Sequence, residues 1–555
     1  MIVIKRGPVM CELGRGDPKK IIPALRVKDP SLFFTFPPHI RKHLPKTAFM
    51  TSFFDEPTRT FPFGLLRRVK RRLKRKGLTF KIVGPAKPEP APITVSDDCL
   101  FDITMRPDQV EDANTIIRAE RGCMSLATNY GKTVFSAAVV INLFEHFQKP
   151  CVVIVPTTTL VRQTAADYKK YFGGRMSVGM IGDKSRTFGD VTFVTAQSAV
   201  FASKPYVDAR NAKVGKKGGH KRYVVWNEEL WNLLQEAICL IVDEGHKGAC
   251  ETYVALLKEC PARYRFGMSG SMESKNKSRD MALRAYLGPI VKERKNKEMI
   301  DRGISANVLV AVVADRKYVG MKIKAPKKKK VWKFSNALGC RVRRKIPIDP
   351  RQRFKLEKDK LLKDLTYNRG IATTVRTSVR GGLKPLILTT SLPQMRLLKG
   401  MLEGLGLSVY EAHGKVPAQT RLQRVKAFAA DPKGVLIGNE VFDEGLNALA
   451  VGAVFLASGG DSIQKIKQRI GRGIRNKLSG LNWVLIFDFY PLRGEYTLKH
   501  AKNRIAVYKK EGFEVLTVSN LLEFRQKVRG NWKGIFGERR FAAELEKQKR
   551  ISAKR

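Results

Sequence analysis

Paired cysteines, long apolar runs and acidic residues are all scarce in this sequence. Its 8 cysteines include no Cys-x-x-Cys pair, so neither a zinc site nor a disulfide framework is expected, and a reducing compartment fits. No stretch reaches the roughly 18 apolar residues of a membrane span. The start, MIVIKR, lacks the apolar core and cleavage site of a signal peptide. We therefore expect a cytoplasmic protein that does not contact a membrane.

Charge is strongly one-sided, with 50 acidic residues against 105 lysines and arginines and a formal net charge of +55. Such an excess predicts a polyanionic partner, above all nucleic acid, and does not decide the fold. Because 43% of the residues are hydrophobic, the chain can build sizeable cores, which excludes a disordered basic tail. The length of 555 residues suggests three or four domains.

Two long segments alternate apolar strand-like runs with amphipathic helix-like runs, at residues 101–300 and about 350–515. This alternation predicts an α/β fold with two tandem, doubly wound parallel sheets, whose ligands lie at the carboxyl ends of the strands. The expected helices include Lys132–Phe147 and Leu160–Phe172. The expected strands are Cys123–Ala127, Cys151–Val155, Val191–Val194, Ile238–Val242 and Arg265–Met268, then Leu386–Leu388, Val409–Ala412, Val435–Ile437, Ala453–Leu456 and Val484–Phe487.

A Gly-Lys-Thr run at 131–133 follows the first of these strands and opens a helix. Backbone N–H groups and the helix dipole attract phosphates at such a position. Lys132 would neutralise the β- and γ-phosphates of a nucleoside triphosphate, and Thr133 would place its hydroxyl on Mg²⁺. The pattern is incomplete, because Leu126 stands where a full phosphate loop has its first glycine. The rest of the expected loop is Thr128, Asn129, Tyr130 and Gly131.

Two carboxylates, Asp243 and Glu244, follow the apolar run Cys239–Val242. Carboxylates at the end of a buried strand are costly to desolvate unless a cation compensates them. We expect Asp243 to hold Mg²⁺, and Glu244 to orient and deprotonate the attacking water. His246 would couple this site to the second domain, or is a packed or capping histidine.

A third run places Gln468, Arg472 and Arg475 on one helical face, at positions i, i+4 and i+7. Arginines that share a direction suit the charge on a transferring phosphoryl group, so we expect arginine fingers. A solvated basic face is the alternative in so basic a chain.

Basic residues also gather outside the alternating segments. The run Arg67–Lys76, with Arg71 and Arg72, predicts a phosphate-binding helix. The run Lys322–Lys345, with Lys328 and Lys329, interleaves cations with aromatic residues; it would clamp a backbone, stack on a base, or form an exposed hairpin without a contact. We predict five parts: a basic α+β accessory domain for nucleic acid at 1–92, an ATP-binding domain at 93–310, a basic interdomain insertion at 311–348, a second α/β domain at 349–515 and a basic tail at 516–555.

In this order the motifs resemble those of superfamily 2 helicases of the DExH kind, which implies two RecA-like domains, ATP and Mg²⁺. Arg106 and Gln109 match the adenine-reading glutamine motif, and Gly445 lies in a match to motif V. Ser269 and Ser271 match the motif that links hydrolysis to movement. The positions that match strand-contacting motifs are Thr157, Thr158, Gln197, Thr389 and Thr390.

Within that superfamily the chain resembles the phage UvsW branch-migration helicases, through Arg265–Ser271, Tyr496–Tyr508 and the small basic domain before the motor. This resemblance implies an ATP-dependent helicase or translocase that acts on Holliday junctions, forks and R-loops in recombination and repair, in the host cytoplasm. The implied partners are branched, single- and double-stranded DNA, and RNA in RNA–DNA hybrids; protein partners are not indicated.

Two other functions stay open. One is an RNA helicase or duplex translocase. The other is a non-catalytic nucleic-acid scaffold, which the joint presence of Lys132, Glu244, Arg472 and Arg475 disfavours.

Overall fold

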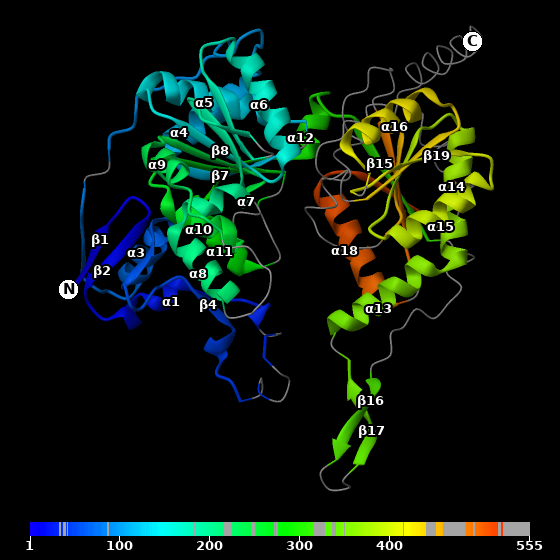
Figure 1. Cartoon of the computed structure of the whole chain (residues 1–555), viewed down its shortest axis with the longest axis horizontal. Coiled ribbons are helices and arrows are strands. Elements are labelled where there is room, and N and C mark those ends of the chain that lie inside the picture. Colours follow the sequence, from blue (N-terminus) through cyan, green and yellow to red (C-terminus); the bar gives the residue numbers. More distant parts are fainter. Residues whose placement is uncertain are drawn as a thin grey trace. The chain divides into compact units, whose positions relative to one another are not determined.

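The chain folds into two compact units, Met1–Arg294 and Lys295–Arg555 (Figure 1). The computed structural model describes residues 1–555 except 33–34, 37–39, 41–42, 86–87, 128, 183–184, 216–223, 246–249, 271, 273–275, 315–327, 336–339, 349, 415, 440–450, 459–482, 492–493, 520–522 and 525–555. Among the residues it describes, no helix has the length and apolar character that crossing a membrane requires.

The N-terminal accessory domain is a four-stranded sheet of order β5-β2-β1-β6 that carries a basic helix, α3. This helix, Leu66–Arg75, buries Leu66, Val69 and Leu73 on one face, so the helix predicted for the basic run is present. Its basic side chains point away from the sheet: Arg67, Arg68, Arg71, Lys74 and Arg75 are exposed. The other elements are β1 Ile2–Arg6, β2 Met10–Arg15, α1 Ile22–Leu25, β3 Arg26–Lys28, β4 Met50–Ser52, β5 Thr60–Pro62 and β6 Phe80–Val83.

An eight-stranded sheet of order β10-β9-β11-β8-β12-β13-β7-β14 forms the rest of the first unit. Its strands run parallel except β10, which is antiparallel to β9. Figure 1 shows α4, α5 and α6 on one side of this sheet and α10 and α11 on the other. The strands are β7 Arg121–Leu126, β8 Cys151–Val155, β9 Val178–Gly182, β10 Ser185–Thr187, β11 Val191–Thr195, β12 Cys239–Asp243, β13 Tyr264–Ser269 and β14 Ile290–Arg294. All strands predicted in this segment are therefore confirmed.

The helices of this unit agree with the predicted ones, and a capping residue explains where one of them begins. Residues 132–147 and 160–172, both predicted as helical, lie in α5 and α6. Because the side chain of Thr157 accepts the backbone N–H of Leu160, α6 begins two residues before the predicted start. The helices are α4 Pro107–Ala119, α5 Lys132–Phe147, α6 Thr158–Phe172, α7 Ala196–Ala199, α8 Lys204–Gly215, α9 Glu228–Glu236, α10 Glu251–Glu259 and α11 Lys277–Tyr286.

One continuous hydrophobic core joins the accessory domain to the parallel sheet. Ile4 and Phe61 of the accessory sheet belong to the same buried cluster as Leu240 of β12 and Leu283 of α11. At Gly64 the backbones come so close that a Cβ atom would lie 2.1 Å from the carbonyl oxygen of Arg284. The accessory domain and the first parallel sheet are thus a single packed unit.

The second unit holds a seven-stranded, fully parallel sheet of order β19-β20-β18-β21-β22-β15-β23. All strands predicted for this part are again present. They are β15 Asn307–Val313, β18 Pro385–Leu388, β19 Ser408–Ala412, β20 Gly434–Gly438, β21 Ala453–Leu456, β22 Trp483–Phe489 and β23 Glu514–Val518. The helices are α12 Asn296–Asp301, α13 Pro350–Lys363, α14 Leu365–Arg380, α15 Leu392–Glu403, α16 Ala418–Ala430 and α18 Tyr496–Lys510.

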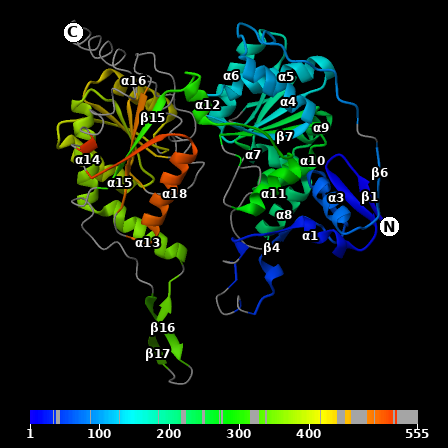
Figure 2. The ribbon, with the colours of Figure 1, turned by 180° about the vertical axis from the view of Figure 1, so that it is seen from behind.

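The structure corrects the predicted boundary between the two motor domains. The predicted boundary, residue 310, falls inside β15, yet β15 pairs in parallel with β22 and β23 of the second sheet. The apolar run of β15 looks like any buried strand, and only its partners, far along the chain, assign it to a sheet. The insertion predicted at 311–348 is therefore not interdomain. It contains β16, Lys328–Ser335, and β17, Cys340–Pro347, which form a separate two-stranded sheet within the second unit (Figure 2).

Candidate functional site

The predicted phosphate loop lies between β7 and α5 and is shaped for an anion. Gly131 has φ of 84° and Asn129 has φ of 69°, so the chain turns sharply before the helix. No side chain caps the start of α5. The first N–H groups of this 16-residue helix are therefore left for a ligand, and an anion is favoured at a helix N-terminus.

A buried polar network holds this loop from behind. The carbonyl oxygen of Tyr130 accepts hydrogen bonds from Gln109 Nε2 at 2.8 Å and from Arg106 Nη2 at 2.7 Å. Gln109 Oε1 accepts the backbone N–H of Arg106 at 3.1 Å. The two residues predicted to read adenine thus bind the phosphate loop in this structure. A Cβ at Gly131 would lie 2.7 Å from Gln109 Nε2, and the positive φ of Gly131 would strain any other residue, so a substitution there would disturb this contact.

Two further members of this network, Asp112 and Arg294, were not found by sequence reasoning. Asp112 accepts the Tyr130 hydroxyl at 2.8 Å and both guanidinium bonds of Arg294 at 2.8 Å. Burial, followed by the charge of Asp112, raises the pKa of Tyr130, so its hydroxyl stays protonated and donates. The hydrogen bonds that Arg294 donates to Asp112 raise the pKa of Arg294, against the effect of burial. The only sequence signal was that Asp112 follows Gln109 by one helical turn.

Lys132, Glu244 and Ser269, which are far apart in the sequence, come together at the carboxyl edge of the sheet. Lys132 Nζ lies 3.8 Å from Glu244 Oε1, and Ser269 Oγ donates to Glu244 Oε2 at 3.0 Å. Adjacent parallel strands cause this meeting, because Asp243 of β12 pairs with Met268 of β13. Glu244 has φ of 51°, a conformation that is uncommon outside glycine and is found at functional sites.

The residues at this edge fit a magnesium nucleotide. Among the described residues, no group of three or more His, Cys, Asp or Glu side chains could hold a metal by itself. Mg²⁺ suits such a place, because it is commonly held by one or two protein groups together with substrate phosphates. Asp243 would supply a carboxylate; its Oδ1 accepts the Glu244 N–H at 2.9 Å. Thr133, in the first turn of α5, would supply a hydroxyl, and the bound ion would neutralise phosphate charge.

The predicted strand-contacting residues of the first unit lie along the same edge. Thr157 lies two residues after the end of β8 and caps α6, while Thr158 begins that helix and is exposed. Gln197 is exposed on α7, directly after β11. Since β8 and β11 are paired neighbours, these side chains follow adjacent strand ends.

In the second unit the two predicted threonines have different environments. Thr389 is fully buried, and its hydroxyl donates to Gln394, so it serves the packing of β18 against α15. Thr390 is half-buried; its hydroxyl accepts from Lys358 Nζ at 2.9 Å, and its N–H donates to Ser458 Oγ at 2.9 Å. Lys358, on α13, was missed because nothing in the sequence links it to a motif 32 residues away.

The remaining predicted residues divide into three groups. Arg71 is exposed on α3, whereas Arg72 Nε donates to the carbonyl oxygen of Lys20 at 2.9 Å. Lys328 and Lys329 open β16. The residues outside the described part of the chain are Thr128, His246, Ser271, Gly445, Gln468, Arg472 and Arg475.

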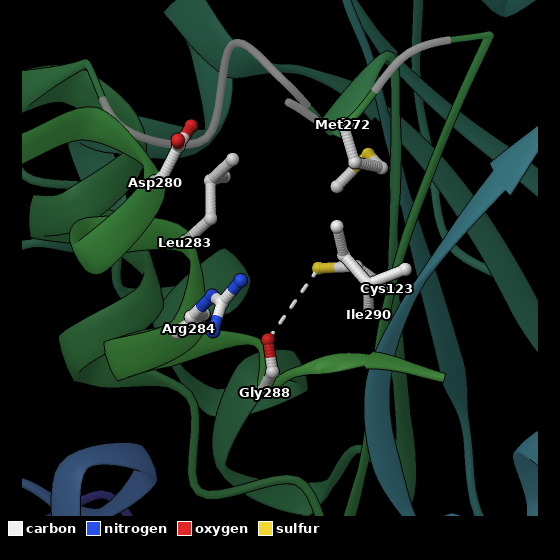
Figure 3. Close-up of a pocket in the computed structure, with 7 residues that line it drawn as sticks. All are labelled: Cys123, Met272, Asp280, Leu283, Arg284, Gly288 and Ile290. Carbon is white, nitrogen blue, oxygen red and sulfur yellow. Dashed lines mark hydrogen bonds between the residues drawn. The ribbon is translucent and has the colours of Figure 1, made fainter. Parts of the chain in front are cut away.

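A cavity of about 120 Å³ lies in the first unit and does not belong to this site (Figure 3). It is lined by Cys123, Met272, Asp280, Leu283, Arg284, Gly288 and Ile290. Cys123 Sγ donates to the carbonyl oxygen of Gly288 at 3.7 Å, and burial raises the pKa of Cys123 to about 12. Its thiol is therefore protonated, and the cavity has no reactive thiolate.

Two regions of the chain match known families. Residues 102–274 match the family described as Type III restriction enzyme, res subunit, and residues 371–477 match the helicase conserved C-terminal domain. Among curated proteins, a probable helicase D10 of Escherichia phage T5 is 21% identical over 399 residues, covering 70% of this chain and 72% of that protein.

One solved structure shares the fold at low sequence identity, and a second aligns over most of the chain with a lower score. A fragment of a putative HsdR subunit of a type I restriction enzyme from Vibrio vulnificus YJ016 aligns with a TM-score of 0.50 and 16% identity, covering 84% of this chain and 75% of that one. The crystal structure of T4 UvsW aligns with a TM-score of 0.38 and 16% identity, covering 93% of this chain and 98% of that one.

Proposed function

Since the chain belongs to the superfamily 2 helicases and is an ATP-dependent helicase with two RecA-like domains, we propose that its substrate is branched DNA. Holliday junctions, forks and R-loops would be the structures on which it works in recombination and repair. The likeness to a phage helicase supports a phage-borne enzyme in the host cytoplasm.

The observation that carries this proposal is the union of the basic accessory domain with the first motor domain. The exposed cations of α3 lie on a domain that shares one hydrophobic core with the ATP-binding sheet. Because this core is tightly packed, the cationic helix α3 keeps a fixed position relative to the ATP-binding sheet. A branched substrate offers a second arm for such an element, whereas a plain single strand does not. Phosphate contacts suit this role because they are independent of sequence.

In the proposed cycle, the first domain supplies the phosphate-binding and catalytic groups. N–H groups of α5 and the Lys132 ammonium would bind the phosphates, with Mg²⁺ held by Thr133 and Asp243. Glu244, oriented by Ser269, would take a proton from the attacking water. Arg472 and Arg475 are proposed to meet the charge of the terminal phosphate from the second domain.

Contacts from both domains would make ATP favour one arrangement of the motor, and loss of the phosphate would release it. During this cycle, strand contacts are proposed for Thr157, Thr158, Gln197 and Thr390. Gln109 and Arg106 would transmit the binding of adenine to the phosphate loop, because both side chains donate hydrogen bonds to the carbonyl oxygen of Tyr130.

The test is ATP turnover with single-stranded DNA, duplex, fork, four-way junction and RNA as stimulants, followed by junction unwinding. We expect the junction and the fork to stimulate ATP turnover most, when every nucleic acid is supplied at the same total concentration of its nucleotide residues. Replacing Arg67, Arg68 and Arg71 of α3 with alanine should remove the advantage of the junction and leave stimulation by single strands. Replacing Lys169 and Lys170, exposed cations of α6, provides the control. Maximal stimulation by RNA, or by blunt duplex, would refute the proposal in favour of an RNA helicase or a duplex translocase.

A further inference from the structure

The two-stranded ribbon β16–β17 has two chemically different faces. Its strands are antiparallel, and the register pairs Lys330 with Lys345, Trp332 with Arg343 and Phe334 with Arg341. Residues directly opposite each other lie on the same face of an antiparallel pair, and faces alternate along each strand. One face, the aromatic face, therefore holds Lys328, Lys330, Trp332, Phe334, Arg341, Arg343, Lys345 and Pro347. The other face holds Lys329, Val331, Lys333, Ser335, Cys340, Val342, Arg344 and Ile346.

The positive charges of this ribbon are not balanced by acidic residues of the ribbon itself. Neither strand contains an aspartate or a glutamate, and the pairing sets Lys330 against Lys345. Like charges directly opposite each other destabilise a strand pair. An anionic ligand bound on this face would reduce the repulsion between the paired cations and so stabilise the ribbon. Both aromatic residues fall on the face with that repulsion, and each is paired with an arginine.

We propose that the aromatic face of β16–β17 is a binding site for single-stranded nucleic acid, which rests on the proposed function and specifies one of its contacts. Trp332 and Phe334 are two residues apart on one strand, about 7 Å along it. That distance allows two bases of one strand to stack on neighbouring rings. The flanking cations would bind the phosphates on either side. A duplex keeps its bases stacked on one another, so its faces are not available to the rings.

The test measures binding of a fluorescent oligonucleotide to the full-length protein at several salt concentrations. The double variant Trp332→Ala/Phe334→Ala should weaken binding of single-stranded DNA at least tenfold and leave binding of blunt duplex within about twofold. On a strand of abasic sites, which keeps the phosphates and lacks the bases, the wild type and this variant should bind equally.

A pair of matched variants separates the two faces. The substitutions Lys330→Ala, Arg343→Ala and Lys345→Ala remove cations from the aromatic face, and Lys329→Ala, Lys333→Ala and Arg344→Ala remove the same number from the other. We expect the first set to lower the slope of log affinity against log salt by about 2 for single strands, and the second set to change it little. None of these variants should melt below the wild type, so a change in binding reports the face that was altered rather than a loss of folding.

Equal effects of both sets, or equal loss on abasic strands, would overturn the proposal. So would binding of anionic phosphatidylserine vesicles that requires the aromatic face while oligonucleotide binding does not. The proposed action on branched DNA is tested separately, because junction-stimulated turnover can persist when this face is altered and fail when it is intact.

Discussion

Ser269 Oγ donates a hydrogen bond to Glu244 Oε2 at 3.0 Å, across neighbouring strand ends. The motif that resembles the link between hydrolysis and movement thus touches the proposed catalytic base directly. A hydroxyl at this place fixes one carboxylate oxygen and leaves the other, 3.8 Å from Lys132 Nζ, toward the phosphate loop.

Replacing Ser269 with alanine should lower kcat about tenfold or more, with little change in the KM for ATP. A hydrogen bond to a charged group contributes about 1.5–3 kcal/mol, and its loss frees the base to turn away. Steady-state ATP turnover checks this, with Ser177→Ala as control, since Ser177 is exposed and donates only to Asp190. A rise in KM at unchanged kcat would contradict the orienting role.

Replacing Lys132 with alanine should reduce ATP turnover at least 100-fold, because the ammonium that neutralises the phosphates is gone. Binding of an oligonucleotide without nucleotide should stay within about twofold, since Lys132 belongs to the phosphate site. The control is Lys149→Ala, an exposed lysine just after the other end of α5. Normal turnover with lost DNA binding would refute the assignment of the phosphate loop.

Lys358 should be a nucleic-acid contact of the second domain. Its ammonium is 2.9 Å from the Thr390 hydroxyl, so a phosphate bound at Thr390 would meet a positive charge. We expect Lys358→Ala to weaken single-strand binding about three- to tenfold and to lower the salt slope by roughly 0.7, the value for one contact. Lys360→Ala removes an exposed cation from the same helix and should have a smaller effect. Equal effects of the two changes would show that Lys358 does not contact nucleic acid at Thr390.

Asp29 should make the first unit sensitive to acid. Its carboxylate accepts bonds from Ser31, from Thr51 and from Asn276, the cap of α11. Burial acts to raise the pKa of Asp29, but these hydrogen bonds outweigh it and lower the pKa to about 2. A lowered carboxylate pKa stabilises the fold above the unfolded value of 3.8, and this stability is lost as the pH falls toward about 2.

The measurement is the difference in melting temperature between wild type and Asp29→Asn across pH. The wild type should melt higher above about pH 4, and the difference should shrink steadily between pH 4 and pH 2. A difference that stays constant over this range would show that the charge of Asp29 does not hold the accessory domain to α11.

The predicted strands and helices were recovered because their signals are local. Continuous apolar runs mark buried parallel strands, and Gly131-Lys132-Thr133 between such a run and an amphipathic run marks a helix start. The carboxylates Asp243 and Glu244 were recognisable for the same reason, since charges rarely end a buried strand without a partner. The resemblance to superfamily 2 helicases came from the order of such local motifs.

Contacts between distant residues were decided only by the tertiary structure. Sequence alone did not show that β15 completes the second sheet, because its apolar run fits either sheet and hydrogen bonding to β22 makes the choice. Nor did it show that Asp112 and Arg294 brace the phosphate loop across 182 residues, or that Lys358 meets Thr390. The amino-acid sequence determined the chemical groups and the elements that carry them; the pairing of strands in space determined which of those groups act together.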